Sequence, residues 1–188
     1  IVRGGKLLPD PVAGTPKVRA QGQGGLLEVA VHPNFAQNHF IYLSYAKPNE
    51  DGKQGTTGLT RAKFENDKLV DAKEIFEAKA WNEAPGHFGG KIAFDNQNHI
   101  FMSVGDKMAG LFPRRPDGAM DPDLTGHPAQ NFTTHQGKIL RLNDDGTVPQ
   151  DNPFVGQAGK LPEIWSYGHR HPQGLAFNPE TGALWETE

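Results

Sequence analysis

Three stretches of the sequence share one pattern: a glycine, a short apolar segment, a polar turn, and a second segment of β-branched or aromatic residues. They are GGLLEVAVHPNFAQNHFIYLSYA (24–46), GGKIAFDNQNHIFMSVGD (89–106) and QGLAFNPETGALWETE (173–188). Two strands joined by a polar turn and repeated along the chain indicate an antiparallel sheet unit that is used several times. This repeat constrains the fold more than any other feature of the sequence.

The repeat predicts an all-β fold, and specifically a β-propeller. The marker glycines Gly25, Gly90 and Gly174 are 65 and 84 residues apart, more than the period of about 40–50 residues in short propeller repeats, so long insertions are expected. A glycine at the inner edge of a unit would let neighbouring strands crowd around a central channel. A closed propeller needs at least about four blades. We therefore expect residues 1–188 to form one partial propeller domain, truncated at both ends. A sandwich of irregular hairpins is the alternative fold.

Composition agrees with many short strands and narrows the class of protein. Glycine and proline number 23 and 15, about a fifth of the chain where about 12% is usual, which favours tight turns. The segment LVDAKEIFEAKA (69–80) fits either a helix or a strand. The net charge of −3 argues against nucleic acid or an anionic membrane as the main partner. No apolar run approaches the roughly 20 residues of a membrane span, and the absence of cysteine excludes thiol chemistry.

Each repeat unit carries a polar side chain just ahead of its first strand. These are Gln23, His87, and the pair Arg170 and His171. Repeat symmetry would bring them together around one axis. Arg170 would supply a fixed fork for carboxylate or quinone oxygens, with a surface ion pair as the alternative. His87 stands directly before Phe88 and a glycine pair, and it is either a functional base or an ordinary buried histidine.

The remaining histidines and acidic residues suggest no further site. His32, His39 and His99 lie in or beside turns and are expected to be solvated. His127 and His135 lie in a long polar loop (114–137) that specifies no ligand. The acidic run 117–123 lacks the spacing of a calcium-binding EF-hand, so no metal ligand is assigned.

Four stretches together carry a family resemblance. They are GQGGLLEVAVHPNFAQNHFIYLSYA, GHFGGKIAFD, HQGKILRLNDDGTVPQDNPF and EIWSYGHRHPQGLAFNPETGALW. In this order they resemble the soluble PQQ-dependent aldose sugar dehydrogenases, the glucose/sorbosone dehydrogenase family. The resemblance covers nearly the whole chain. It implies a six-bladed β-propeller of which this chain is roughly the first half.

The resemblance also implies roles for the same four residues. His87 would be the general base, a task that suits an imidazole near neutral pH. Gln23 and His171 would contact pyrroloquinoline quinone (PQQ), and Arg170 would hold the quinone and stabilise charge on it. The family binds Ca²⁺ through backbone carbonyls of a Gly-Pro pair that follows LWxxE, and this chain ends at Glu188.

Three positions depart from the family's usual residues. Gly86 stands where relatives usually have Asp or Asn, His171 where they usually have Asn, and Lys91 where Arg is commoner. The first two bear on sugar preference and quinone affinity.

The leading hypothesis is therefore a periplasmic or secreted enzyme that oxidises aldose sugars with PQQ and Ca²⁺ and passes electrons to an external acceptor. The second is a non-catalytic propeller that binds a ligand or a protein, which Gly86 and His171 favour. A sugar lactonase is the third, but it would need a carboxylate-rich central metal site, which the sequence does not show.

Overall fold

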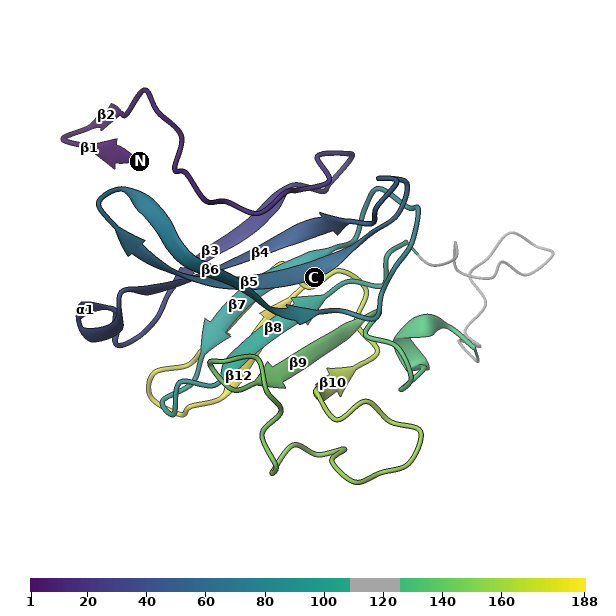
Figure 1. Cartoon of the computed structure of the whole chain (residues 1–188). Coiled ribbons are helices and arrows are strands. Elements are labelled where there is room, and N and C mark those ends of the chain that lie inside the picture. The colour runs from purple at the N-terminus through teal and green to yellow at the C-terminus, as the bar shows by residue number, and fades with distance from the viewer. Residues whose placement is uncertain (109–125) are drawn as a thin grey trace.

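The computed structural model describes residues 1–108 and 126–188, and most regular structure in these residues is β-strand (Figure 1). The helical elements in this range are one turn of α-helix, α1 (Phe35–Asn38), and one 3₁₀ turn, η1 (Pro128–Gln130). The strands form two four-stranded and two two-stranded antiparallel sheets. The predicted all-β fold is confirmed.

The first four-stranded sheet is a meander in which each strand pairs with the next. Its strands are β3 (Leu26–Val31), β4 (Phe40–Pro48), β5 (Gly55–Glu65) and β6 (Lys68–Glu77). A tight turn joins β5 to β6, and its central residues Asn66 and Asp67 have φ of 49° and 63°. Short polar side chains tolerate this left-handed conformation, which matches the twist of a two-residue hairpin. The hairpin pairing makes the ambiguous segment 69–80 a strand over most of its length.

The second four-stranded sheet repeats this meander. Its strands are β7 (Gly89–Phe94), β8 (Ile100–Val104), β9 (Lys138–Leu142) and β10 (Ile164–Tyr167). A two-stranded sheet follows, made of β11 (Gly174–Phe177) and β12 (Leu184–Thr187). A short hairpin, β1 (Val2–Arg3) and β2 (Lys6–Leu7), precedes them all. The three predicted units therefore begin at β3, β7 and β11.

The second sheet is buried on both faces. One face carries Ile92, Met102 and Leu140, which pack with Tyr42 and Leu59 of the first sheet. The other face carries Phe101 and Ile139, which pack with Leu175 of β11. Every residue of β8 and β9 is buried, as expected for a sheet that lies between two others.

The first strands of the three units lie side by side, because β7 contacts both β3 and β11. Successive antiparallel sheets whose first strands lie next to one another are the arrangement predicted for propeller blades. A sandwich of irregular hairpins would not place them in this way. The crowding argument for glycine holds at Gly90, where φ is 93° and an added Cβ would lie 2.6 Å from Leu27 Cδ1 on β3. It is wrong for Gly25, where an added Cβ would meet nothing within 4 Å, and for Gly174, where it would meet Thr187 of its own sheet.

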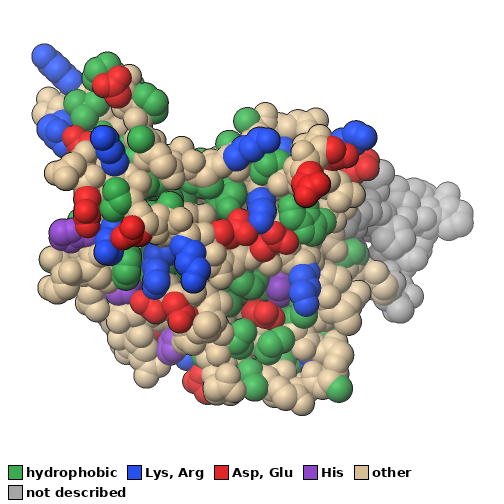
Figure 2. Space-filling model, viewed as in Figure 1, with side chains coloured by type: hydrophobic (Ala, Val, Ile, Leu, Met, Phe, Trp, Pro, Cys, Tyr) green, Lys and Arg blue, Asp and Glu red, His purple; other side chains and the backbone are tan. Residues whose placement is uncertain are grey.

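Charged side chains of both signs are interspersed on the face shown in Figure 2, in keeping with the small net charge of −3. Within the described ranges, the longest helix is far too short to cross a bilayer.

Candidate functional site

The turns that precede β3, β7 and β11 meet, and they bring together the polar residues selected from the sequence. Gln23 Oε1 accepts a hydrogen bond from the backbone N–H of His87 at 2.8 Å. The imidazoles of His87 and His171 stack, with ring centroids 4.8 Å apart and an interplanar angle of 20°. Arg170 lies at the same turn, and its backbone carbonyl accepts the N–H of Asp106 at 2.8 Å. Arg170 is exposed, whereas His87 is buried.

His87 is held in an unusual backbone conformation. Its φ is 51°, in the left-handed region that few residues other than glycine adopt. Lys107 and Met108, at the facing turn after β8, also have positive φ values of 63° and 52°. Positive φ at non-glycine residues costs free energy and clusters at functional sites. The strain at this contact therefore supports a role beyond packing.

Asp106, which no sequence pattern singles out, orients the His87 ring. Its Oδ1 lies 2.6 Å from His87 Nδ1, and Asp106 is 3% exposed. Because a carboxylate accepts, His87 Nδ1 carries a proton, and in the neutral form of the ring the lone pair is on Nε2. Asp106 lies two residues beyond β8, the strand that pairs with β7, and no sequence pattern marks it as a partner of His87.

His171 is a neutral partner in the stack. Burial and the neighbouring His87 lower the pKa of the His171 imidazole. Its Nε2 lies 3.1 Å from the side-chain nitrogen of Gln173, which can only donate, so Nε2 accepts and Nδ1 carries the proton. His171 therefore presents an N–H donor at Nδ1.

Gly86, one of the positions expected to depart from the family's usual residues, lies where a larger side chain would meet its neighbours. An added Cβ at Gly86 would lie 2.7 Å from Met108 Sδ and 3.0 Å from Gln23 Oε1. A larger side chain there would push against the glutamine that holds the His87 backbone.

A cavity of about 360 Å³ adjoins these residues. It is lined by Gln23, Leu26, Leu27, Glu28, Gly89, Lys91 and Gln173. Lys91 pairs with Glu28 across the inner strands at 2.7 Å. A larger hollow, of about 570 Å³, lies around Arg3, Phe35 and His39. The smaller cavity is the better candidate for a ligand-binding site. Its lining includes Gln23, whose side chain accepts the backbone N–H of His87.

Lys107, beside Asp106, is a second residue at this site that no sequence motif singles out. It is fully buried, and its Nζ lies 2.9 Å from the centroid of the Phe88 ring without a hydrogen-bond acceptor. Burial, and then the charge of Arg19, lower the pKa of Lys107 to about 7. No pattern in the sequence around Lys107 predicts its burial.

The other histidines correct one expectation. His32 was expected to be solvated, but it is 4% exposed, and its Nδ1 accepts the N–H of Asn34 at 2.9 Å. His99 is partly buried and pairs with Asp95 at 2.8 Å. Residues 117–123 lie outside the described residues. His127, from the same loop, lies 3.9 Å from Asp106 Oδ2.

Comparisons with known proteins agree with the resemblance seen in the sequence. The profile of the glucose/sorbosone dehydrogenase family matches residues 1–188. The aldose sugar dehydrogenase YliI of Escherichia coli K12 is 40% identical over 185 residues, which cover 98% of this chain and 46% of that protein. The chain spans about half the length of the curated relatives it matches.

Solved structures show the same likeness in three dimensions. The structure of a glucose dehydrogenase is 44% identical with a TM-score of 0.85, and the match covers 100% of this chain and 51% of that one. The PQQ-bound form of aldose sugar dehydrogenase from Streptomyces coelicolor is 25% identical with a TM-score of 0.71, over 94% of this chain and 46% of that one.

Proposed function

Because the chain belongs to the glucose/sorbosone dehydrogenase family, we propose that it forms part of an enzyme that oxidises the anomeric hydroxyl of aldose sugars to the lactone. The observation that carries this proposal is the meeting of Gln23, His87 and His171 from three successive units, with Asp106 behind the His87 ring.

His87 is the proposed general base. Oxidation of the anomeric carbon removes a hydride from carbon and a proton from the hydroxyl. The Nε2 lone pair of His87 accepts that proton, because Asp106 fixes the other ring nitrogen as a donor. The imidazolium that results is stabilised by the Asp106 carboxylate at 2.6 Å. Stacking on the neutral ring of His171 restricts rotation of the base.

The donors at this site fit an acceptor-rich planar cofactor such as PQQ. Gln23 Oε1 is occupied by the His87 amide, which leaves the Gln23 NH₂ group to donate. His171 donates through Nδ1, and Arg170 adds a guanidinium from the same turn. Carbonyl and carboxylate oxygens are the matching acceptors. When bound, PQQ supplies the two-electron acceptor for the reaction.

Arg170 has a second proposed role. A fixed positive charge near the cofactor oxygens favours the negative charge that develops during oxidation, so Arg170 is assigned both to cofactor binding and to catalysis. The Ca²⁺ implied by the resemblance belongs to the proposal, and no side chain of residues 1–188 is assigned as its ligand.

The proposed partners follow from this chemistry. The substrate is an aldose sugar, and an external acceptor removes the electrons from the reduced cofactor. We propose a periplasmic or secreted location on the family resemblance alone.

Reconstitution of the full-length protein tests the proposal. With PQQ and Ca²⁺ added, dye reduction is expected with at least one sugar from a panel of aldoses. His87→Ala should lower kcat by about 10²–10⁴-fold while PQQ still changes the absorption spectrum. Turnover retained by His87→Ala would refute the base assignment. Absence of both turnover and a PQQ-induced spectral change would favour the non-catalytic binding module.

A further inference from the structure

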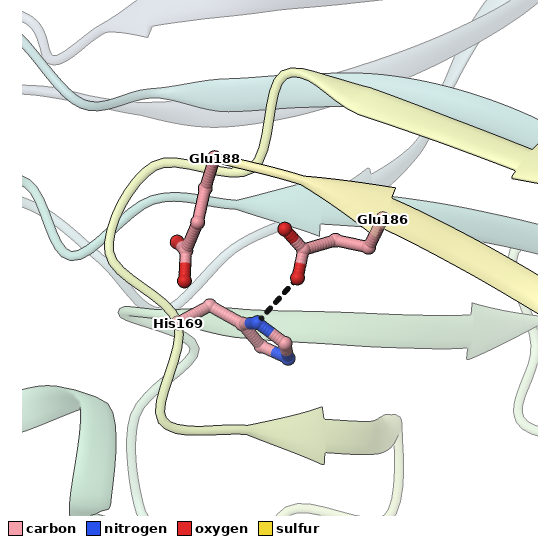
Figure 3. A group of neighbouring side chains, drawn as sticks. All are labelled: His169, Glu186 and Glu188. Carbon is pink, nitrogen blue, oxygen red and sulfur yellow. Dashed lines mark ion pairs between the residues drawn. The ribbon is translucent and has the colours of Figure 1, made fainter.

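The two-stranded sheet of β11 and β12 places two glutamates beside the candidate site. Glu186 lies on β12, and Glu188 follows directly after it. Both carboxylates face the turn that carries His169 (Figure 3). Glu188 Oε2 accepts the backbone N–H of Arg170 at 2.5 Å and that of His171 at 2.9 Å. Glu186 Oε2 pairs with His169 Nδ1 at 3.0 Å.

The turn is thereby fixed from two sides. Glu188 holds the amides of Arg170 and His171, while the Arg170 carbonyl accepts the N–H of Asp106 from the end of β8. Hydrogen bonds from backbone N–H groups to a carboxylate are shorter and stronger than neutral ones. This turn has no regular strand or helix of its own, so these bonds determine where its side chains begin.

We propose that Glu188 is a positioning residue of the candidate site. Its carboxylate holds the backbone of residues 170 and 171, so that His171 stacks on His87 and the Arg170 guanidinium extends from a fixed point. The expected effect of Glu188 on cofactor binding rests on the proposed function. The placement of residues 170 and 171 by its carboxylate does not.

The same cluster could be interpreted as a metal site. One ligand atom each from His169, Glu186 and Glu188 lies within 4.8 Å of the others. These groups already have protein partners, however. His169 uses Nδ1 for Glu186 and Nε2 for Ser166 Oγ at 2.9 Å, and Glu188 Oε2 accepts two amides. Protein hydrogen bonds therefore account for the arrangement without an ion.

Amide hydrogen exchange in the full-length protein, without cofactor or sugar, tests the positioning role. Glu188→Ala should speed exchange at Arg170 and His171 by about tenfold or more and abolish the NOE between the His87 and His171 rings. Glu188→Gln should preserve part of the protection, because the side-chain carbonyl still accepts. Glu180→Ala, an exposed glutamate in the β11–β12 turn, is the matched control and should change neither reading.

Two outcomes would overturn the inference. One is unchanged exchange in Glu188→Ala. The other is protection that appears only when Mn²⁺ or Zn²⁺ is added and that is lost in Glu186→Gln, which would establish a metal site instead.

Turnover separates this inference from the proposed function. If the full-length protein oxidises an aldose, Glu188→Ala should weaken PQQ binding by about tenfold, and Glu188→Gln should restore much of it. If it oxidises no aldose but the exchange result holds, the proposed function fails and the positioning role stands.

Discussion

At the residue scale, the pair His87 and Asp106 shows what the sequence could and could not reveal. His87 could be selected because it precedes a glycine pair at the start of a repeat unit. Asp106 could not, because its role depends on the turn after β8 folding back against the turn before β7, as the bond from the Lys107 amide to the His87 carbonyl shows. Contacts between turns depend on the tertiary fold, which the repeat pattern does not specify in such detail.

Replacing Asp106 with Asn tests the orientation of the base. The amide can donate to His87 Nδ1, which would leave the proton on Nε2 and remove the base. If the proposed function holds, kcat for aldose oxidation by the full-length protein should fall by about 10²-fold or more, with PQQ binding retained.

Asp95→Asn is the matched control, since Asp95 makes a similar 2.8 Å pair with His99 away from the site. Equal losses in the two variants would show that Asp106 acts on folding and not on the base.

The lowered pKa of Lys107 should make the free energy of unfolding of the protein depend on pH. This pKa falls from the model-compound value of 10.5 to about 7 because the ammonium is buried. Between about pH 7 and 10.5 the folded chain thus binds fewer protons at this group than the unfolded chain, so the free energy of unfolding should rise with pH across that window. Lys107→Met should remove this rise and raise the free energy of unfolding at pH 7 by about 2–4 kcal/mol.

Denaturant titrations from pH 7 to 10 measure the effect. Lys53→Met, at an exposed lysine, should change the free energy of unfolding by about 0.5 kcal/mol or less. Parallel pH profiles for the wild type and Lys107→Met would contradict the lowered pKa of Lys107.

At the scale of elements, the repeat predicted where each sheet begins, because apolar alternation and polar turns are local signals. It did not predict the later strands, such as β9 and β10, whose pairing spans long connections. Nor did it give the right reason for two of the three marker glycines. Whether a glycine is required at such a position depends on contacts with other strands. Of the three, Gly90 is the one where an added side chain would meet a neighbouring unit.

Gly90→Ala should therefore destabilise the contact between the first two sheets. An added methyl group would meet Leu27 in a backbone conformation with φ of 93°, and strain and overpacking together should cost about 2–4 kcal/mol. Gly52→Ala is the control, because Gly52 also has positive φ, 73°, but an added Cβ would have open space. We expect about 1 kcal/mol there. A double variant with Leu27→Ala removes Cδ1 but keeps the Cβ, which would lie 2.8 Å from the added methyl. It should recover part of the Gly90→Ala loss in thermal unfolding, and no recovery would exclude Leu27 Cδ1 as the source of the loss.

At the scale of the whole molecule, the β3 side of one apolar face of the first sheet is exposed in the described chain. Val29 and Val31 of β3 are 51% and 56% exposed, and beside them lies a hollow of about 420 Å³ with an apolar lining that includes Ile41 and Leu43. The second sheet is covered on both faces by its neighbours. Since the curated relatives are about twice as long as this chain, we propose that a further sheet of the full-length protein covers this face in the same way.

The same substitution should then have opposite effects in the two lengths of protein. In the 188-residue chain, Val29→Glu with Val31→Glu should reduce self-association, because the exposed apolar surface becomes charged. In the full-length protein it should lower the free energy of unfolding by about 2–4 kcal/mol, because the carboxylates would be buried against the next sheet. Sedimentation measures the first effect and denaturant unfolding the second, with Val2→Glu on the separate β1 hairpin as the control in both. A full-length variant as stable as the wild type would mean that this face stays open to solvent, and the ring of sheets would not close here.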